Sequence, residues 1–228
     1  MLPSEAHTTT PPTPERRRQL TGKTKLIGLC ILLALASLTT WASTKTRIVD
    51  LSSDTQMHSR GVYKAWAKGS VIVLIRHAER CDRSTTPCLG DPTGITVAGS
   101  QAARDVGNGL LQLGLNDADV FSSPAVRTRQ TAHFIFGKAI GTQDWVQACD
   151  EDFASTALAH KAPAHNLVLV THSGCIDHME RQLNVPGALR SAEYASALFI
   201  SVAANGKPRI LGQMNASEWQ KLVDSTRT

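Results

Sequence analysis

The 228-residue sequence has no internal repeat and no closely spaced Cys-x-x-Cys pair, which argues against repeat architectures and against common structural zinc sites. Over most of its length it also has no excess of basic residues. The formal net charge is +5, and five basic and two acidic side chains in residues 1–25 account for +3 of it. The remainder is nearly balanced in charge, so we expect no nucleic-acid-binding surface.

The sequence has one long hydrophobic run, at residues 26–38. It continues weakly to Ala42. Basic residues precede it, so we expect residues 1–25 to be a disordered cytoplasmic segment and the chain beyond the run to be exported. The 13-residue run is typical of a signal peptide cleaved near Ala42. Residues 26–42 are also just long enough for a membrane anchor. Both alternatives stay open, and a buried core helix is a third that these flanks disfavour.

Five apolar, mostly β-branched residues at 71–75 show no polar alternation, which predicts a strand buried on both faces of a parallel sheet. Four charged or imidazole side chains follow at once: Arg76, His77, Glu79 and Arg80. Ligands of open α/β sheets bind beyond the carboxyl ends of strands, so we expect catalysis at this edge. Taken alone, the segment could also be a strand followed by an ordinary charged loop.

Two further segments repeat this design. Residues 167–171 are a second apolar stretch, and they deliver His172 to its end. Residues 121–132 read Phe-Ser-Ser-Pro-Ala-Val-Arg-Thr-Arg-Gln-Thr-Ala, which places Arg127 one turn into a helix after a short strand. A lone arginine or histidine at such a position is more often structural than catalytic. Three strand ends that supply His77, Arg127 and His172 in one chain favour catalysis.

These segments resemble the histidine phosphatase superfamily, which includes the phosphoglycerate mutases and many phosphatases. Its members carry Arg-His-Gly or Arg-His-Ala on the first strand, then Ser-Ser-x-x-x-Arg-x-x-Gln-Thr-Ala, then a second histidine in Thr-His or Ser-His. All three motifs occur here in order, between residues 71 and 174. The longer run at residues 76–84, with Cys88, is similar to the lipopolysaccharide core heptose(II)-phosphate phosphatases of Gram-negative bacteria.

The resemblance implies phosphoryl transfer without a metal or cofactor, and the motif positions imply a role for each residue. His77 would attack phosphorus to form a phosphohistidine, while a backbone carbonyl holds its other ring nitrogen. Arg76 and Arg127 would bind phosphate oxygens through their planar guanidinium groups. A protonated His172 would donate a further hydrogen bond. Together these groups would neutralise the charge on the transferred phosphoryl group.

Arg80 is a further candidate for phosphate binding. It stands four residues after Arg76, where the phytase-like branch of the superfamily has an extra phosphate-binding arginine. The alternative is a salt bridge from Arg80 to Glu79 or Asp82, and both readings stay open.

The leaving alkoxide needs a proton from an acid with a raised pKa, placed opposite the nucleophile. The phytase-like branch uses an Asp directly after the second histidine, and Ser173 occupies that position here. The mutase-like branch uses a Glu from the loop after the intervening strand, where this sequence has acidic residues at 150–152. The resemblance therefore points to Asp152, then to Glu151, with Glu79 as a further candidate. A solvated acidic turn is the alternative interpretation.

Four cysteines follow the hydrophobic run, an even number that is compatible with disulfides in an oxidising compartment. Four cysteines allow three pairings. We favour Cys81 with Cys88, which would close a loop beside the nucleophile, and Cys149 with Cys175, which would join two strand ends. Four reduced thiols are the alternative.

Strands that alternate with helices predict a three-layer α/β/α sandwich with a mostly parallel central sheet over residues 43–228. Thr96 is a candidate cap for a helix with an apolar stripe at residues 102, 106, 110 and 113. Further helices are expected at 52–68, 125–135 and 176–183, and further strands at 145–148, 197–202 and 208–214, the last two antiparallel. The insert between Ala132 and His172 is too short for a large cap domain.

These features favour a phosphatase in the periplasm, either soluble or tethered to the inner membrane through residues 26–42. Its expected partner is a phosphorylated sugar, most specifically a heptose phosphate of the lipopolysaccharide core. A broad-specificity periplasmic acid phosphatase is one alternative. A non-catalytic envelope protein that binds phosphate groups is another.

Overall fold

The computed structural model describes residues 26–27, 29–31, 33 and 45–225, and it divides the chain into two units, residues 1–44 and 45–228. The six described residues of the first unit are helical and exposed. The predictions for residues 1–25, and for most of 26–42, lie outside the described residues. Within the described ranges, no helix has both the length and the apolar character needed to cross a membrane.

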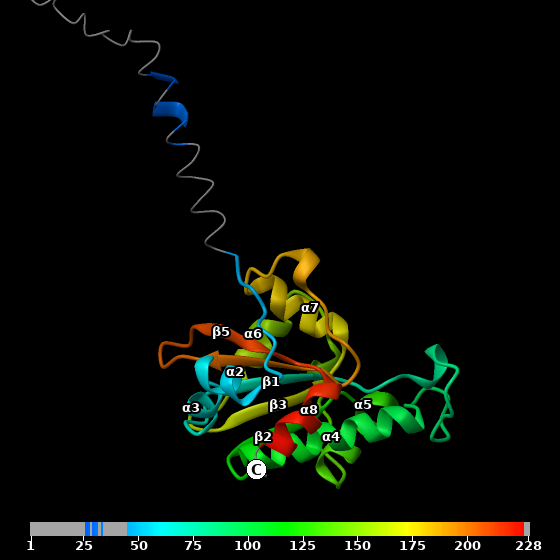
Figure 1. Cartoon of the computed structure of the whole chain (residues 1–228). Coiled ribbons are helices and arrows are strands. Elements are labelled where there is room, and N and C mark those ends of the chain that lie inside the picture. Colours follow the sequence, from blue (N-terminus) through cyan, green and yellow to red (C-terminus); the bar gives the residue numbers. More distant parts are fainter. Residues whose placement is uncertain (1–25, 28, 32, 34–44, 226–228) are drawn as a thin grey trace, which may run out of the picture. The chain divides into compact units, whose positions relative to one another are not determined.

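A five-stranded sheet in the order β2-β3-β1-β4-β5 forms the centre of the second unit (Figure 1). β3 pairs in parallel with both β1 and β2, whereas β4 is antiparallel to both β1 and β5. Four of the five strands therefore run in one direction, as predicted. The strand bounds are β1 Val71–Arg76, β2 Ala118–Ser122, β3 Asn166–Thr171, β4 Ala197–Val202 and β5 Pro208–Met214.

The apolar run of β1 is buried on both faces because successive side chains alternate across the sheet. Ile72 and Leu74 pack into one hydrophobic cluster, and Val71, Val73 and Ile75 pack into the other, all with no exposed surface. Each cluster is closed by helices. One layer holds α6 (Phe153–Ala159) and α7 (Ser173–Gln182), and the opposite layer holds α2 (Asp54–Ser59), α3 (Val62–Trp66), α4 (Val97–Leu113), α5 (Val126–Phe136) and α8 (Ala216–Ser225).

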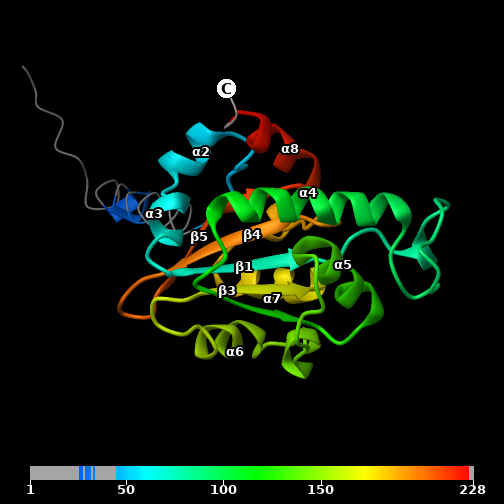
Figure 2. The same cartoon turned by 90° about the horizontal axis from the view of Figure 1, so that it is seen from below.

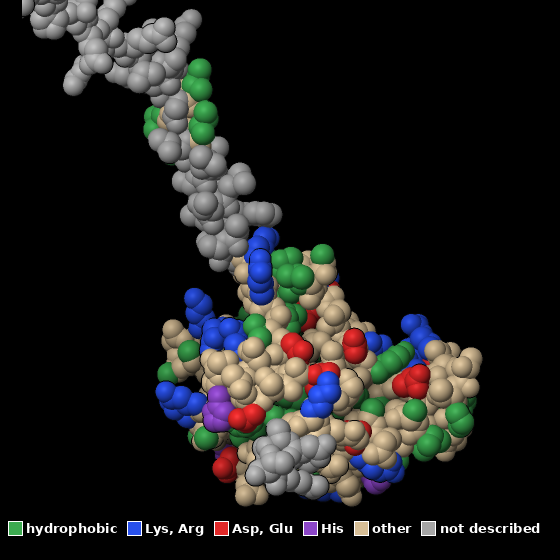
Figure 3. Space-filling model, in the orientation of Figure 1, with side chains coloured by type: hydrophobic (Ala, Val, Ile, Leu, Met, Phe, Trp, Pro, Cys, Tyr) green, Lys and Arg blue, Asp and Glu red, His purple; other side chains and the backbone are tan. Residues whose placement is uncertain are grey.

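These layers confirm the predicted α/β/α sandwich. Figure 2 shows α4 running across one side of the sheet and α6 on the other, with the arrowheads of β1 and β3 at the same edge. Figure 3 shows acidic and basic side chains interspersed on one face, in keeping with the balanced charge of this part of the sequence.

The long helix α4 begins where the sequence predicts. The Thr96 Oγ1 accepts a hydrogen bond from the backbone N–H of Gly99 at 2.9 Å, which satisfies one of the free donors of the first turn. Val106 and Leu110 of the predicted stripe are fully buried. Later in the same helix, a Cβ at Gly109 would lie 1.9 Å from the Trp219 ring, so this position admits only glycine at the contact with α8.

Two predicted elements differ from the structure. The helix expected over residues 52–68 is divided into α2 and α3, because Gly61 adopts a left-handed conformation with φ +74° between them. Residues 145–148 were expected to be a strand, and the structure has a 3-10 helix there, η2 (Asp144–Gln147). The buried Val146 carbonyl accepts a hydrogen bond from the Thr171 hydroxyl at 2.6 Å, so the segment packs against the end of β3 instead of extending the sheet. The other short 3-10 helices are η1 (Cys81–Arg83) and η3 (Gly187–Leu189).

The four cysteines lie at disulfide distance in the two pairs that the sequence analysis favours. Cys81 is bonded to Cys88 across the loop that follows β1. Cys149 is bonded to Cys175 in the first turn of α7, close after His172. The second bridge joins segments 26 residues apart, so it removes more conformational freedom from the unfolded chain than the first, whose separation is 7.

We predict that replacing both Cys149 and Cys175 with Ala lowers the free energy of unfolding by about 3 kcal/mol under oxidising conditions. The matched control is the pair Cys81→Ala and Cys88→Ala, for which the shorter loop predicts about 2 kcal/mol. Urea denaturation of the three proteins measures both losses. Equal midpoints for the wild type and the Cys149, Cys175 variant would show that this bridge does not stabilise the fold.

Candidate active site

The carboxyl ends of β1 and β3 bring the two predicted histidines side by side. The strands are parallel neighbours in which Arg76 pairs with Thr171, so His77 and His172 both follow directly. The backbone N–H of His77 donates to the Thr171 carbonyl at 2.9 Å, and the two imidazole rings lie 5.5 Å apart. The third predicted strand end, after β2, contributes Arg127 in the first turn of α5.

His77 is held in one tautomer. The residue is 3% exposed, and its Nδ1 lies 2.8 Å from the Ala78 carbonyl oxygen. A carbonyl can only accept, so Nδ1 carries the hydrogen and the lone pair is on Nε2. Burial lowers the pKa of His77 to about 3, against the opposing effect of the Ala78 hydrogen bond. The ring is therefore neutral at physiological pH, with a nitrogen free to act as a nucleophile.

His172 is held in the opposite tautomer. Its Nδ1 lies 3.2 Å from Nη2 of Arg127, which can only donate, so Nδ1 accepts and Nε2 carries the hydrogen. Nε2 then donates to the Ser123 hydroxyl at 2.9 Å. Burial, followed by the positive charges of Arg127, Arg80 and Arg76, lowers the pKa of His172 to about 4. The resemblance implies a protonated His172 beside phosphate, which stays a prediction, and these surroundings by themselves favour the neutral ring.

Arg76 and Arg127 provide the positive charge at this edge. Arg76 donates from Nη1 to the Ala192 carbonyl at 2.6 Å, and its guanidinium lies 3.8 Å from the centre of the Tyr194 ring. Burial lowers the pKa of both arginines. Within the described part of the chain, the Nε–H groups of both are buried without a hydrogen-bond partner. Buried donors are normally paired, and the oxygens of a phosphate are the acceptors that arginine prefers.

Arg80 lies within electrostatic range of this group but is already paired. Its Nε donates to Asp82 Oδ1 at 2.7 Å, and its Nη2 contacts the second carboxylate oxygen. This ion pair is the alternative to phosphate binding that the sequence leaves open for Arg80. The positive charge of Arg80 nevertheless contributes to lowering the pKa values of Arg76, Arg127 and His172. A phosphate-binding role for Arg80 stays a prediction.

Glu79 is one of the candidates for the general acid, and hydrogen bonds hold its carboxylate in one position. Its oxygens accept hydrogen bonds from the hydroxyls of Thr96, Ser84 and Thr86, at 2.7, 3.0 and 3.1 Å. These bonds lower the pKa of Glu79, with that from Thr96 the largest cause. The carboxyl therefore stays ionised at neutral pH, which is the opposite of what a proton donor needs.

Asp152 and Glu151 are exposed at the start of α6. Gln182 of α7 donates a hydrogen bond to the backbone carbonyl of Glu151, which holds this turn against α7. The contacts described for His77 and His172 include neither carboxylate. The structure thus gathers the histidines and arginines into one site without joining the acidic turn to them, and the acid role of both residues stays a prediction.

Three contributors to the site are not predicted from the sequence. Ser123 stands in the recognised Ser-Ser segment, so its contact with His172 could have been inferred from that motif. The Ala192 carbonyl and the Tyr194 ring come from the loop before β4, far along the chain from Arg76, and no local pattern marks them.

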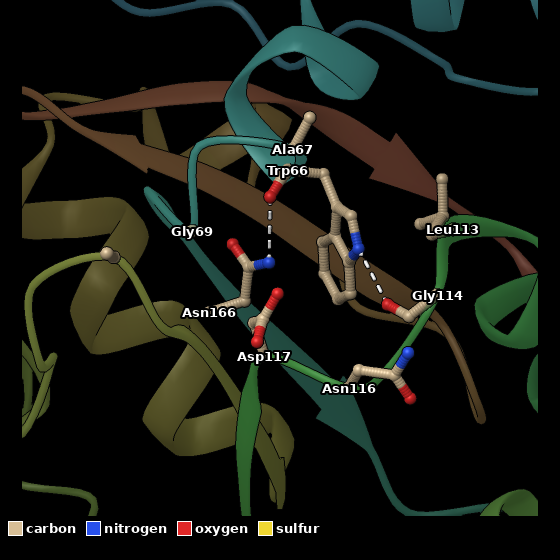
Figure 4. Close-up of a pocket in the computed structure, with 9 residues that line it drawn as sticks. Trp66, Ala67, Gly69, Leu113, Gly114, Asn116, Asp117 and Asn166 are labelled. Carbon is tan, nitrogen blue, oxygen red and sulfur yellow. Dashed lines mark hydrogen bonds between the residues drawn. The ribbon is translucent and has the colours of Figure 1, made fainter.

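A pocket of about 160 Å³ lies elsewhere, at the amino-terminal ends of the strands (Figure 4). The indole of Trp66 donates to the Gly114 carbonyl at 2.8 Å, and Asn166 donates to the Trp66 carbonyl at 2.9 Å. Asn166 also accepts a hydrogen bond from the backbone N–H of Val71 at 3.0 Å. These polar groups hydrogen-bond β1, β3 and α3 to one another, so we assign the pocket a structural role and no ligand. In the described ranges, no cluster of three or more histidine, cysteine or acidic side chains could hold a metal ion.

The lowered histidine pKa values predict that acid destabilises the protein. Between pH 6.5 and 3 the unfolded chain binds a proton at His77 that the folded chain does not, so stability falls as the pH falls through this window. His172 acts in the same direction down to about pH 4. At pH 5 the contribution of His77 alone is roughly 2 kcal/mol.

Urea denaturation at pH 7 and pH 5 measures this loss. We expect His77→Gln to lose less stability than the wild type over this interval, by roughly 2 kcal/mol. His58→Gln, which changes a histidine whose side chain is 68% exposed, is the matched control and should lose as much as the wild type. If all three proteins lost the same stability between pH 7 and pH 5, His77 would not be buried and neutral in the folded protein.

Comparisons with known proteins agree with this geometry. A search against models of known protein families finds no match. The chain is 36% identical over 192 residues to the lipopolysaccharide core heptose(II)-phosphate phosphatase of Shigella flexneri serotype 5b. The aligned region covers 82% of this chain and 90% of that protein. It is 38% identical over 171 residues to the protein of the same name from Escherichia coli K12, covering 72% of this chain and 81% of the relative.

Among solved structures, the protein histidine phosphatase SixA in complex with tungstate superposes with a TM-score of 0.51, covering 64% of this chain and 97% of SixA. Its 15% sequence identity makes this a likeness of fold alone. The identity to the curated relatives, at more than two thirds coverage, establishes the family. The chain belongs to the family of lipopolysaccharide core heptose(II)-phosphate phosphatases and has the histidine phosphatase fold.

Proposed function

We propose that this chain is a phosphomonoesterase that forms a phosphohistidine on His77 and removes the phosphate from a heptose of the lipopolysaccharide core. One observation carries the proposal. The neutral His77 ring directs its free Nε2 away from the Ala78 carbonyl, at a strand end where Arg76 and Arg127 each have a buried donor without a partner. A nucleophile and a set of oxyanion donors in one place are what phosphoryl transfer requires.

In the first step, Nε2 of His77 attacks phosphorus and the bond from phosphorus to the sugar oxygen breaks. Because Nδ1 donates to the Ala78 carbonyl, the positive charge that develops on the ring is stabilised by an acceptor already in place. In the second step, water attacks the phosphohistidine, and the bond between nitrogen and phosphorus breaks to release phosphate. Dividing hydrolysis in this way replaces one difficult step with two easier ones.

Arg76, Arg127 and His172 bind the oxygens that carry charge in both transition states. Arg127 bridges the site because its Nη2 also donates to His172. A phosphate dianion beside His172 would raise the pKa that these arginines lower, so the substrate itself would favour the protonated ring. Pre-formed donors in a buried site lose little energy to reorganisation when the charge develops.

The proposed substrate follows from the curated relatives, whose name specifies the phosphate of a core heptose. The chain covers 90% of the Shigella flexneri relative, so the comparison extends over nearly the whole of that protein. The exposed Arg83, on the disulfide-closed loop after β1, also contributes positive charge to the surroundings of Arg76 and Arg127. An additional cation at the rim suits a substrate that carries more than one anionic group.

We further propose that the catalytic unit works in the periplasm. The basic residues before the run at 26–42 support export, and the pairing of Cys81 with Cys88 and of Cys149 with Cys175 suits an oxidising compartment. Residues 26–42 would then serve as a cleaved signal peptide or as a membrane anchor. An envelope location would also place the protein near its proposed substrate.

Phosphate release by residues 43–228 tests the catalytic proposal. With a chelator present, we expect His77→Ala to lower the rate by at least about 10³-fold on p-nitrophenyl phosphate and on phosphorylated core oligosaccharide. His58→Ala is the matched control and should match the wild type. A wild type that prefers p-nitrophenyl phosphate would favour a broad-specificity phosphatase. Stoichiometric phosphate binding without turnover would favour a non-catalytic binding protein.

Arg127→Lys tests whether the planar guanidinium is needed as well as its charge. Lysine keeps the charge but cannot donate to His172 and to phosphate from one fork, so we expect kcat to fall by about 10²-fold. Arg129→Lys, an exposed position two residues along the same helix, is the matched control. If the two variants retained equal activity, Arg127 would not be a phosphate ligand.

A further inference from the structure

The proposed reaction needs a proton donor that the carboxylates near the site do not readily supply. The Glu79 carboxylate accepts three hydroxyl hydrogen bonds that hold it ionised, and Asp82 is paired with Arg80. Asp152 and Glu151 lie in an exposed turn outside the contacts of the two histidines. A sugar alkoxide is a strong base, so its departure without a proton would be slow.

Tyr194 lies directly against the nucleophile. Its ring centre is 5.7 Å from that of His77, and the Arg76 guanidinium stacks on it at 3.8 Å. The loop that carries it is fixed to the end of β1 by two backbone hydrogen bonds. The N–H of Ala195 donates to the His77 carbonyl at 3.3 Å, and the N–H of Arg76 donates to the Ser196 carbonyl at 3.0 Å. The position of the ring is therefore tied to the catalytic strand.

The Tyr194 oxygen is coupled electrostatically to three arginines of the site. A negative charge on the Tyr194 oxygen would raise the pKa values of Arg76, Arg80 and Arg127, which come from β1, the loop after it and α5. The oxygen is thus within electrostatic reach of the groups that would hold the phosphate. The Tyr194 residue, next to Arg76 and His77, is only partly buried.

We propose that the Tyr194 hydroxyl is the acid that protonates the leaving sugar oxygen, an inference that rests on the phosphatase function proposed above. As the bond from Nε2 of His77 to phosphorus forms and the bond from phosphorus to the sugar oxygen breaks, the hydroxyl proton passes to that oxygen. The products of this step are the sugar alcohol, the phosphohistidine and a Tyr194 phenolate.

The second step restores the enzyme. Water attacks phosphorus, the bond from phosphorus to Nε2 breaks, and one proton of the water returns to the phenolate as inorganic phosphate forms. The phenolate exists between these steps beside Arg76, whose positive charge stabilises it. A phenol is a stronger acid than a sugar alcohol, so the first transfer is favourable, and the phenolate is basic enough to accept the proton back.

Removing one oxygen atom tests the proposal. Tyr194→Phe keeps the ring that stacks on Arg76 and deletes the proposed proton. We expect kcat/KM to fall by about 10²-fold or more on a sugar phosphate, whose leaving oxygen needs a proton. On p-nitrophenyl phosphate, whose leaving group departs as a stable anion, we expect less than about a threefold change. Retained activity on the aryl ester also shows that the variant is folded.

The sequence provides one further tyrosine, and it is the matched control. Tyr63 donates to Asp54 at 2.7 Å in the helical layer, so Tyr63→Phe should change kcat/KM only slightly, and by the same factor on both substrates. A series of aryl phosphates with leaving groups of increasing basicity gives a second measurement. The rate of Tyr194→Phe should fall more steeply along this series than that of the wild type.

Equal losses on both substrates would overturn the proposal, because a residue that only positions Arg76 affects every ester alike. Unchanged activity on the sugar phosphate would overturn it as well. Failure of the underlying function is distinguishable, since His77→Ala would then release phosphate from the aryl ester as fast as the wild type, or the wild type would release none.

Discussion

The hydrogen bond from His77 Nδ1 to the Ala78 carbonyl determines what the rest of the site can do. It fixes the proton on one ring nitrogen and leaves the lone pair on the other. Burial of the ring at the end of a fully buried strand then keeps it unprotonated. A protonated or rotated His77 could not attack phosphorus, and the surrounding cations would bind an anion without reacting with it.

Gathering positive and ionisable groups at this edge of the sheet is energetically unfavourable, and the rest of the fold must stabilise them. Two arginines and two imidazoles are partly or fully desolvated there, and burial is the largest cause of the lowered pKa of each. The two hydrophobic clusters on either side of the sheet, together with backbone carbonyls such as that of Ala192, hold these groups in place. A phosphate dianion would relieve their mutual repulsion, so this arrangement of groups suits an anionic ligand.

Much of this arrangement could be predicted from the sequence because it is encoded locally. The unbroken apolar run at 71–75 can only be a strand covered on both sides, and a parallel neighbour at 167–171 then sets His172 beside His77. Contacts between distant segments carry no such signal. Tyr194 and Ala192 reach Arg76 only once β4 has paired with β1, so no spacing could reveal them.

Short segments were also ambiguous. Residues 145–148 have too few apolar positions to distinguish a strand from a single turn, and the hydrogen bond from Thr171 to Val146 decided in favour of the turn. The choice for Arg80 between phosphate and a carboxylate depended likewise on geometry, because Asp82 lies two residues away along the same loop.

The proposed mechanism requires that His77 becomes phosphorylated during turnover. Rapid acid-free quenching during hydrolysis of a phosphate ester, followed by mass spectrometry of the peptide that contains residue 77, tests it directly. We expect a phosphate group on His77 that is stable in base and lost in acid, as a phosphoramidate should be. A protein that turns over substrate while carrying no phosphate on His77, or carrying it on another residue, would contradict it.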